Sequence, residues 1–226
     1  VAERRVGDFN PLDLSNTAWA FATAGQPDAQ LFVALARALA ERRVSDFKPQ
    51  ELANTAWAFA TLGQLDAQLF SALAREAEHR MGDFKPQELA STAWAFAKVN
   101  LSEALFFHAL SRVAKRCLRN FHAQELTVMV WAFATVRWSD ALMFAGLMRA
   151  AEQRLGNFKV QELANTAWAF AVVNYRDEKL FAALARAAEW RLIHFNPQSM
   201  ANTAWAFATV RYRDERLFAA LARAPE

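Results

Sequence analysis

The chain has 226 residues, of which 54% are hydrophobic, enough to bury a continuous core. No apolar run approaches the roughly 18 residues of a membrane-spanning helix, which argues against such a helix in this sequence. With 26 basic and 23 acidic residues the formal net charge is +3, which permits a polyanionic partner without requiring one, and the lone Cys117 rules out a disulfide framework within the chain.

A phrase, Asn-Thr-Ala-Trp-Ala-Phe-Ala, recurs with small changes around six tryptophans. The first spacing is 38 residues and each later one is 37: Trp19, Trp57, Trp94, Trp131, Trp168 and Trp205. A fixed period in this range indicates one supersecondary unit stacked repeatedly. We therefore predict a single solenoid over 1–226, with the tail of a preceding repeat at 1–8, repeats at 9–46, 47–83, 84–120, 121–157 and 158–194, and an incomplete repeat at 195–226. Because both ends fall within a repeat, we expect a fragment of a longer protein.

The second repeat illustrates the predicted elements. Its first helix is expected from Pro49, which suits the first turn, to about Leu62, with Glu51 near the positive end of the helix dipole. A left-handed residue should end this helix, at the position held in the successive repeats by Gly25, Gly63, Asn100, Arg137, Asn174 and Arg211.

The second helix is expected to open on an acid and to end near Arg80. The acids in register are Asp28, Asp66, Glu103, Asp140, Asp177 and Asp214. Two antiparallel helices per repeat and no strand signal predict an all-α fold, a right-handed α-solenoid of stacked helix pairs.

Helical projection assigns the faces of the first helix. Leu52, Ala56, Trp57 and Phe59 fall in one sector and are expected to pack between repeats. Repeated tryptophans can also stack nucleobases, but their place among core residues favours packing.

A second sector holds a row formed by Gln50, Asn54, Ala58 and Thr61. Its Asn positions are Asn16, Asn54, Ser91, Val128, Asn165 and Asn202, and its Thr positions are Thr23, Thr61, Lys98, Thr135, Val172 and Thr209. The alanines of the row are expected to leave room for a base: Ala20, Ala58, Ala95, Ala132, Ala169 and Ala206. Two interpretations stay open, a binding ladder of small polar side chains and an ordinary solvated helix face.

Charged residues recur at three places. Lysines precede the first helix at Lys48, Lys85 and Lys159, and later inter-helix turns carry Arg137, Arg176, Arg211 and Arg213 beside Trp138, Tyr175 and Tyr212. These turns either bind unpaired bases or a partner, or merely cover the edge of the stack. Acids near the helix start oppose phosphate binding: Glu51, Glu88, Glu125 and Glu162.

A further arginine series lies on the second helices, at Arg37, Arg75, Arg112, Arg149, Arg186 and Arg223. We expect a solvated outer face on which these arginines pair with acids three or four residues onward, namely Glu41, Glu78, Glu152 and Glu189.

The repeated unit Phe-Lys-Pro-Gln-Glu-Leu-Ala-Asn-Thr-Ala-Trp-Ala-Phe-Ala, followed by Asp and Leu-Phe-x-Ala-Leu-Ala-Arg, resembles the octotricopeptide and heptatricopeptide repeats. It is also similar to FAST leucine-rich and RAP-associated organellar RNA-binding proteins and to helical scaffold proteins of mitochondrial RNA editing. The resemblance covers Phe9 to Ala224. It implies single-stranded RNA binding in a mitochondrion or chloroplast, with effects on RNA processing, stability or translation.

Helical repeats can read RNA at about one base per unit, and an Asn amide can both donate to and accept from a base edge. The predicted RNA-binding residues are therefore the Asn and Thr rows, without Val128 and Val172, together with Lys48, Lys85 and Lys159 and the turn residues Arg137, Arg176, Arg211 and Arg213. The alternative is a protein–protein scaffold of an organellar RNA-processing complex, because a sequence reader needs varied base-facing residues and four of the six rungs carry Asn.

Catalytic patterns were sought among the histidines, acids and glycines. His79, His108, His122 and His194 are scattered over different repeats, and no Gly-rich phosphate loop or Gly-x-Ser-x-Gly occurs. We expect no enzyme activity, metal, cofactor or small-molecule substrate. The expected partners are single-stranded RNA and other subunits of an RNA-processing complex, with no membrane.

Overall fold

The computed structural model describes residues 5–41 and 44–223, apart from the side chain of Glu41. Over these residues the regular secondary structure is helical, with α-helices in consecutive pairs joined by short turns and no strand. The predicted tail and final repeat are thus described from Arg5 and up to Arg223. The pairs are α2 (Pro11–Thr23) with α3 (Ala29–Glu41), α4 (Pro49–Thr61) with α5 (Ala67–Arg80), α6 (Pro86–Lys98) with α7 (Ala104–Cys117), α8 (Ala123–Thr135) with α9 (Ala141–Glu152), α10 (Val160–Val172) with α11 (Glu178–Glu189), and α12 (Pro197–Thr209) with α13 (Glu215–Arg223).

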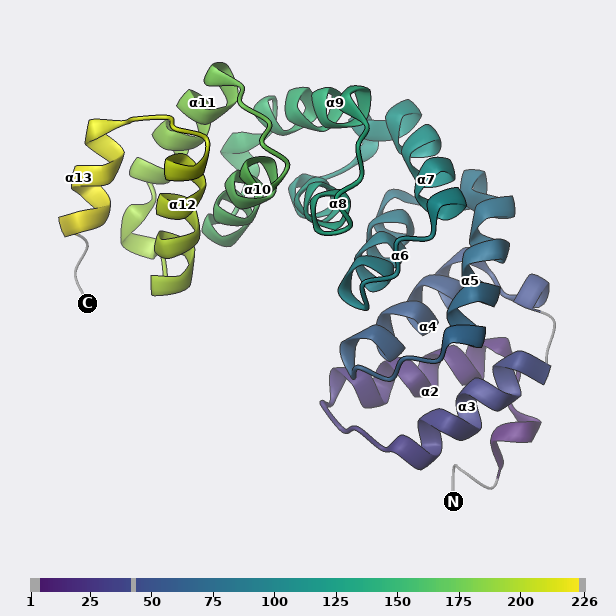
Figure 1. The fold of residues 1–226 in the computed structure, drawn as a ribbon. Helices are drawn as coiled ribbons and strands as arrows, with labels where there is room; N and C mark the ends of the chain where they lie inside the picture. The colour runs from purple at the N-terminus through teal and green to yellow at the C-terminus, as the bar shows by residue number, and fades with distance from the viewer. Residues whose placement is uncertain (1–4, 42–43, 224–226) are drawn as a thin grey trace. The chain divides into compact units, whose positions relative to one another are not determined.

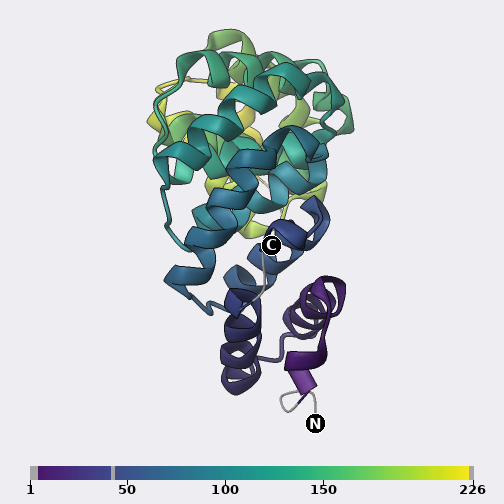
Figure 2. The ribbon, with the colours of Figure 1, turned by 90° about the vertical axis from the view of Figure 1, so that its right-hand side faces the viewer.

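Contacts divide the chain into two compact units, unit 1 (Val1–Arg116) and unit 2 (Cys117–Glu226). In each unit the first helices of the pairs, the A helices, pack side by side: α2 against α4 and α4 against α6, then α8 against α10 and α10 against α12. The second helices, the B helices, form the other layer (Figure 1). Figure 2 shows α2 and α3 of unit 1 next to each other, joined by their short turn. The predicted all-α solenoid of helix pairs is confirmed.

A 3₁₀ turn precedes each A helix. These turns are η1 (Val6–Asp8), η2 (Val44–Asp46), η3 (Met81–Asp83), η4 (Leu118–Asn120), η5 (Leu155–Asn157) and η6 (Leu192–His194). In α2, α4, α6, α8 and α10 the third residue of the A helix is an acid whose carboxylate turns back on the chain, whereas in α12 the Asn196 side chain accepts from the Ser199 N–H. In α4, Glu51 accepts a hydrogen bond of 2.9 Å from the Lys48 backbone N–H, and in α6 Glu88 does the same at 2.7 Å from Lys85. These bonds satisfy N–H groups that the helix start leaves open.

Each A helix ends in a left-handed residue, as the sequence predicts. All six positions have φ between 53° and 65°, including Arg137 at 53° and Arg211 at 59°. The next backbone N–H bonds to the carbonyl five residues back, for example from Gln64 to Phe59 at 2.9 Å, which is a Schellman arrangement. The B helix then opens on the expected acid: the Asp66 carboxylate accepts from the Leu69 N–H at 2.8 Å.

The core of each unit is a series of phenylalanine contacts between successive repeats. The B-helix Phe70 meets Phe96 of the following A helix edge to face at 5.3 Å, and in unit 2 Phe181 meets Phe207 at 5.2 Å. Such edge contacts suit the charge distribution of the rings. In α4, α6, α8 and α10 the alanines of the repeated phrase are buried, which lets neighbouring A helices of a unit approach closely.

An arginine at the end of the B helix closes individual repeats. Arg191 donates to the carbonyls of Gly156 and Phe158, each at 2.7 Å, and to that of Leu155 at 3.3 Å. Arg80 likewise donates to the carbonyl of Phe47 at 2.7 Å. The end of a repeat is thereby tied to the 3₁₀ turn at its beginning, a function that the sequence did not reveal.

The ion pairs expected on the outer face are not formed by Arg75, Arg149 or Arg186, although all three side chains are exposed. Arg5 pairs instead with Asp8, and Arg80 with Glu76 and Asp83. Exposed pairs gain little over hydration, so the guanidinium groups stay in solvent. The expected partner Glu41 lies outside the described side chains. None of the helices over residues 5–41 and 44–223 is long and apolar enough to cross a membrane.

Candidate nucleic-acid interface

In α4, α6, α8 and α10 one narrow stripe of the A helix reaches the surface. In α4 it consists of Gln50, Asn54, Trp57 and Thr61, while the eight other residues after Pro49 are buried. The same positions are accessible in α6, α8 and α10, including Asn165 and Trp168 of α10. We call this set of residues the Asn–Trp stripe. In α4, which lies between α2 and α6, and in α10, which lies between α8 and α12, the neighbouring A helices cover most of the remaining surface, so this stripe is the part that is left for a ligand.

The composition of the stripe corrects the sequence prediction at one position. Ala58 and its equivalents in α6, α8, α10 and α12 are fully buried, so they leave no room for a base. Ala20 of α2 is exposed. At 100° per residue, Trp57 lies about −20° and Ala58 about 80° from Gln50, whereas Asn54 and Thr61 lie at about 40° and 20°. The helical projection therefore already indicates that Trp57, and not Ala58, lies in the same row as Gln50, Asn54 and Thr61.

In each unit two tryptophans of neighbouring A helices lie side by side along the stripe and are not fully buried in the core. The rings of Trp57 and Trp94 lie 6.3 Å apart with a tilt of 33°, and those of Trp168 and Trp205 lie 6.4 Å apart with the same tilt. Trp205 is 47% exposed and the inner rings are half-buried. The rings of Trp57 with Trp94 and of Trp168 with Trp205 thus meet between repeats, as expected, but they also remain partly accessible on the stripe.

The Asn rungs are available for hydrogen bonding. Asn54, Asn165 and Asn202 are half-buried, Asn16 is exposed, and Ser91 is half-buried. Their side chains make no hydrogen bond to other described residues. The half-buried Val128 interrupts this row in α8. An amide held on a rigid helix with its donors and acceptor unused can bind a polar ligand.

The Thr rungs differ from one another. Thr23 and Lys98 are exposed, and Thr209 is half-buried. The hydroxyl oxygens of Thr61 and Thr135 are buried without a hydrogen-bond partner in the structure. For these two residues the surface part of the side chain is therefore apolar.

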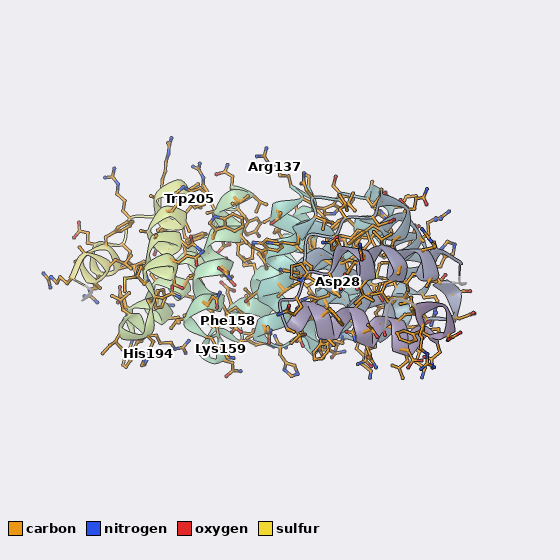
Figure 3. The ribbon with its side chains drawn as sticks, turned by 90° about the horizontal axis from the view of Figure 1, so that it is seen from below. Asp28, Arg137, Phe158, Lys159, His194 and Trp205 are labelled. Atoms are coloured by element: carbon orange, nitrogen blue, oxygen red, sulfur yellow. The ribbon has the colours of Figure 1, made fainter. Side chains whose placement is uncertain are left out.

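The basic residues lie at the two ends of the A helices. Lys48, Lys85 and Lys159 are exposed at the N-terminal ends, and Arg137, Arg176, Arg211 and Arg213 are exposed at the turns that follow the C-terminal ends. Figure 3 shows Arg137 and Lys159 at opposite edges of unit 2. A 13-residue helix separates these edges by about 18 Å. The acids Glu51, Glu88, Glu125 and Glu162 each bond the backbone at the helix start, so their negative charge is partly opposed.

The turn aromatics rest on the core. The Tyr175 ring lies 5.6 Å from that of Phe170 and 6.5 Å from that of Phe144, and Tyr212 contacts Phe207 at 5.8 Å. Burial, followed by the charge of Asp177, raises the pKa of Tyr175. These rings cover the edge of the stack, and the turn arginines beside them point to solvent.

The four histidines, two of them (His79 and His108) in unit 1 and two (His122 and His194) in unit 2, are all exposed. Over residues 5–41 and 44–223 no three His, Cys, Asp or Glu side chains gather in a way that would hold a metal ion.

A protein-family comparison finds one family, described as RNA-editing substrate-binding complex 6 protein, over residues 2–141 and again over 119–225. No curated protein matches the chain significantly. The match agrees with the resemblance to helical proteins of RNA editing, whereas the resemblance to octotricopeptide repeats stays a prediction. Because the two matched segments together cover nearly the whole sequence, the chain belongs to the RNA-editing substrate-binding complex 6 family.

Proposed function

We propose that this chain is a non-catalytic, RNA-binding component of an RNA-editing substrate-binding complex in the mitochondrion, and that it binds single-stranded RNA along the Asn–Trp stripe. The family match supports the RNA-editing context. The chain's partners in this proposal are single-stranded RNA and other subunits of the complex.

The observation that carries the proposal is the pairing of an unbonded amide with an accessible indole on the same stripe. Asn54 and Trp57 stand three residues apart on α4, and Asn165 and Trp168 repeat the arrangement on α10. Aromatic rings bind bases of any sequence by stacking, and amides bind base edges. Four of the six repeats carry such a pair, which supports about one nucleotide for each of these repeats.

The test is binding of the whole chain to a randomised single-stranded RNA pool at two salt concentrations, with sequencing of the bound fraction. We expect binding that weakens with salt, at a log–log slope of about −0.7 per phosphate contacted. Asn165→Ala and Trp168→Leu should each reduce affinity, by about three- to tenfold if each contact contributes about 1 kcal/mol. The matched control is Arg186→Gln, on the exposed face of α11. If both stripe variants bind RNA with unchanged affinity, RNA does not bind along the stripe.

The second candidate is a protein scaffold without base reading. It is favoured by two apolar side chains at the end of the fifth repeat, Trp190 at 88% and Ile193 at 83% exposure. The corresponding residues of the third and fourth repeats are polar or glycine: Arg116, Arg119, Gln153 and Gly156. Trp190→Gln with Ile193→Ser should release a partner subunit in a pull-down while leaving RNA binding intact.

A further inference from the structure

A cleft lies between two consecutive A–B turns of unit 2. The turns at 137–141 and 172–175 border a space of about 530 Å³, with Arg137 and Trp138 on one side and Asn174 and Tyr175 on the other. A space of about 510 Å³ lies at the next turn, beside Arg211. Both volumes are in the range of small-ligand sites. Figure 3 shows Arg137 at this edge of unit 2.

The walls of the first cleft combine fixed rings with polar groups. Tyr175 is held in place by Phe144 and Phe170, as described above, so its ring is a rigid wall. Beside it, the Arg176 Nε donates to the Asn174 Oδ1 at 2.8 Å, which orients that guanidinium and leaves the Asn174 amide N–H groups unused. Rigid rings next to arginines are suited to an unstacked base and its phosphate.

Arg137 has a left-handed backbone conformation that glycine or asparagine would adopt with less strain. Its φ is 53°, whereas the same position holds Gly25, Gly63, Asn100 and Asn174 in other repeats. Glycine and asparagine adopt positive φ with little strain, and arginine does not. A strained residue that the fold does not need is an indication of function. Arg211 repeats this choice at the second space.

An acid also borders the cleft. The Asp140 Oδ1 accepts a hydrogen bond of 2.9 Å from the Met143 N–H at the start of α9. The positive end of the helix dipole opposes its negative charge, which reduces the repulsion of a phosphate.

The cleft is continuous with the Asn–Trp stripe. Val172 is the last stripe residue of α10 and also lines the cleft. A strand that lies along the stripe therefore reaches the cleft without crossing a buried region.

We propose that this cleft takes one unstacked nucleotide of a single-stranded RNA, with the base between Trp138 and Tyr175 and the phosphate on Arg137. This inference rests on the proposed function, since the strand is delivered by the stripe. It adds a site of different chemistry, at which arginine and aromatic rings replace amide and indole.

The experiment measures affinity of the full chain for a labelled single-stranded RNA of randomised sequence, together with thermal stability. The variant is Arg137→Asn, which reproduces the residue found at Asn100 and Asn174 and so removes the charge without breaking the turn. We expect affinity to fall about tenfold, as for loss of a charged hydrogen bond. We also expect Tm to rise by roughly 2–4 °C as strain is relieved. Trp138→Leu should lower affinity without the gain in stability.

The matched control is Arg186→Gln, which removes the same charge from the exposed face of α11 and should change affinity less than twofold. If Arg137→Asn and Arg186→Gln lower RNA affinity equally, the cleft proposal is wrong and RNA is bound by general charge attraction. Full affinity of Arg137→Asn alongside weakened binding by Asn165→Ala would overturn the cleft and leave the proposed function standing. If the unaltered chain does not bind RNA, both the cleft proposal and the proposed function are overturned. If the unaltered chain binds a protein partner that the Arg137→Asn variant no longer binds, the cleft is a site for that protein instead of RNA.

Discussion

Unit 1 and unit 2 each repeat the same helix pair three times, with the same left-handed turns and the same kind of phenylalanine contact, but they differ in charge. Residues 1–116 contain 13 basic and 13 acidic residues, whereas residues 117–226 contain 13 basic and 10 acidic ones, so the net charge of +3 belongs to unit 2. Four of its arginines, Arg137, Arg176, Arg211 and Arg213, stand on A–B turns. The equivalent positions of unit 1 hold uncharged residues: Gly25, Gly63 and Asn100 at the first, and Pro27, Leu65 and Ser102 at the second.

This difference separates the residues that specify the fold from those that are free to specialise. The buried phrase and the caps are held constant because each repeat must pack against the same neighbour. The turns are exposed, so their side chains can change without loss of packing. The charge of unit 2 is therefore an indication of function rather than of fold.

The largest expected effect tests the similarity of the two units. Phe59→Ala in unit 1 and Phe170→Ala in unit 2 remove side chains that are at most 1% exposed and occupy the same place in the repeat. Each should lower the free energy of unfolding by about 3–5 kcal/mol through lost burial and the resulting cavity. Urea denaturation measures both. A difference above about 2 kcal/mol would show that the units are not energetically alike.

A smaller loss is expected from the repeat-closing arginines. Arg191→Ala leaves the carbonyls of Leu155, Gly156 and Phe158 without their guanidinium donor, which should cost about 2–3 kcal/mol. Arg80→Ala should cost about 1–2 kcal/mol in unit 1, since the Phe47 carbonyl accepts its shortest bond. The exposed Arg186→Ala is the control and should stay within about 0.5 kcal/mol. Equal values for Arg191 and Arg186 would refute a closing function.

The fourth repeat provides a way to sharpen the comparison in binding. Val128 interrupts the Asn row of unit 2, so Val128→Asn should raise RNA affinity by about three- to fivefold through one new amide contact. Asn165→Val, the reverse change one repeat later, should lower it by a similar factor. Anisotropy titration of a labelled single-stranded RNA measures both changes. If both variants bind as the unaltered chain does, the Asn row does not contact RNA.

The smallest effect concerns alkaline pH. Burial raises the pKa of the Cys117 thiol, and burial followed by the charge of Asp177 raises that of Tyr175. Both groups therefore hold their protons more tightly in the folded than in the unfolded chain. Their contribution to stability is complete below the ordinary pKa values, near pH 8.5 and 10, and is lost as pH rises through the raised ones. Unit 2 should thus lose protection in hydrogen exchange above pH of about 9, and Cys117→Ser with Tyr175→Phe should flatten that loss.

Much of the fold could be predicted because the same helix-start and turn signals recur in six copies of the repeat. The start of α4 at Pro49, the left-handed turn at Gly63 and the acid that opens α5 all follow from local backbone chemistry. The accessible stripe was only partly predictable: the helical projection places Trp57 in the row, but the complete burial of Ala58 depends on packing against neighbouring A helices, which no single repeat specifies. The closing bond from Arg191 and the cleft beside Arg137 join residues more than thirty positions apart, and no local pattern reports such distances.

The closing arginine also defines where this protein can be cut and joined. Arg191 and its acceptors lie within residues 155–191, and Arg80 and its acceptors within 45–81, so donor and acceptors travel on the same 37-residue segment. A 37-residue segment that begins at the 3₁₀ turn therefore contains both the closing arginine and the carbonyls that it bonds, so these hydrogen bonds stay intact within the segment when it is duplicated or moved. Gene duplication with that phase would lengthen the protein one finished module at a time, and an engineer who adds or removes repeats should place the junctions at these turns.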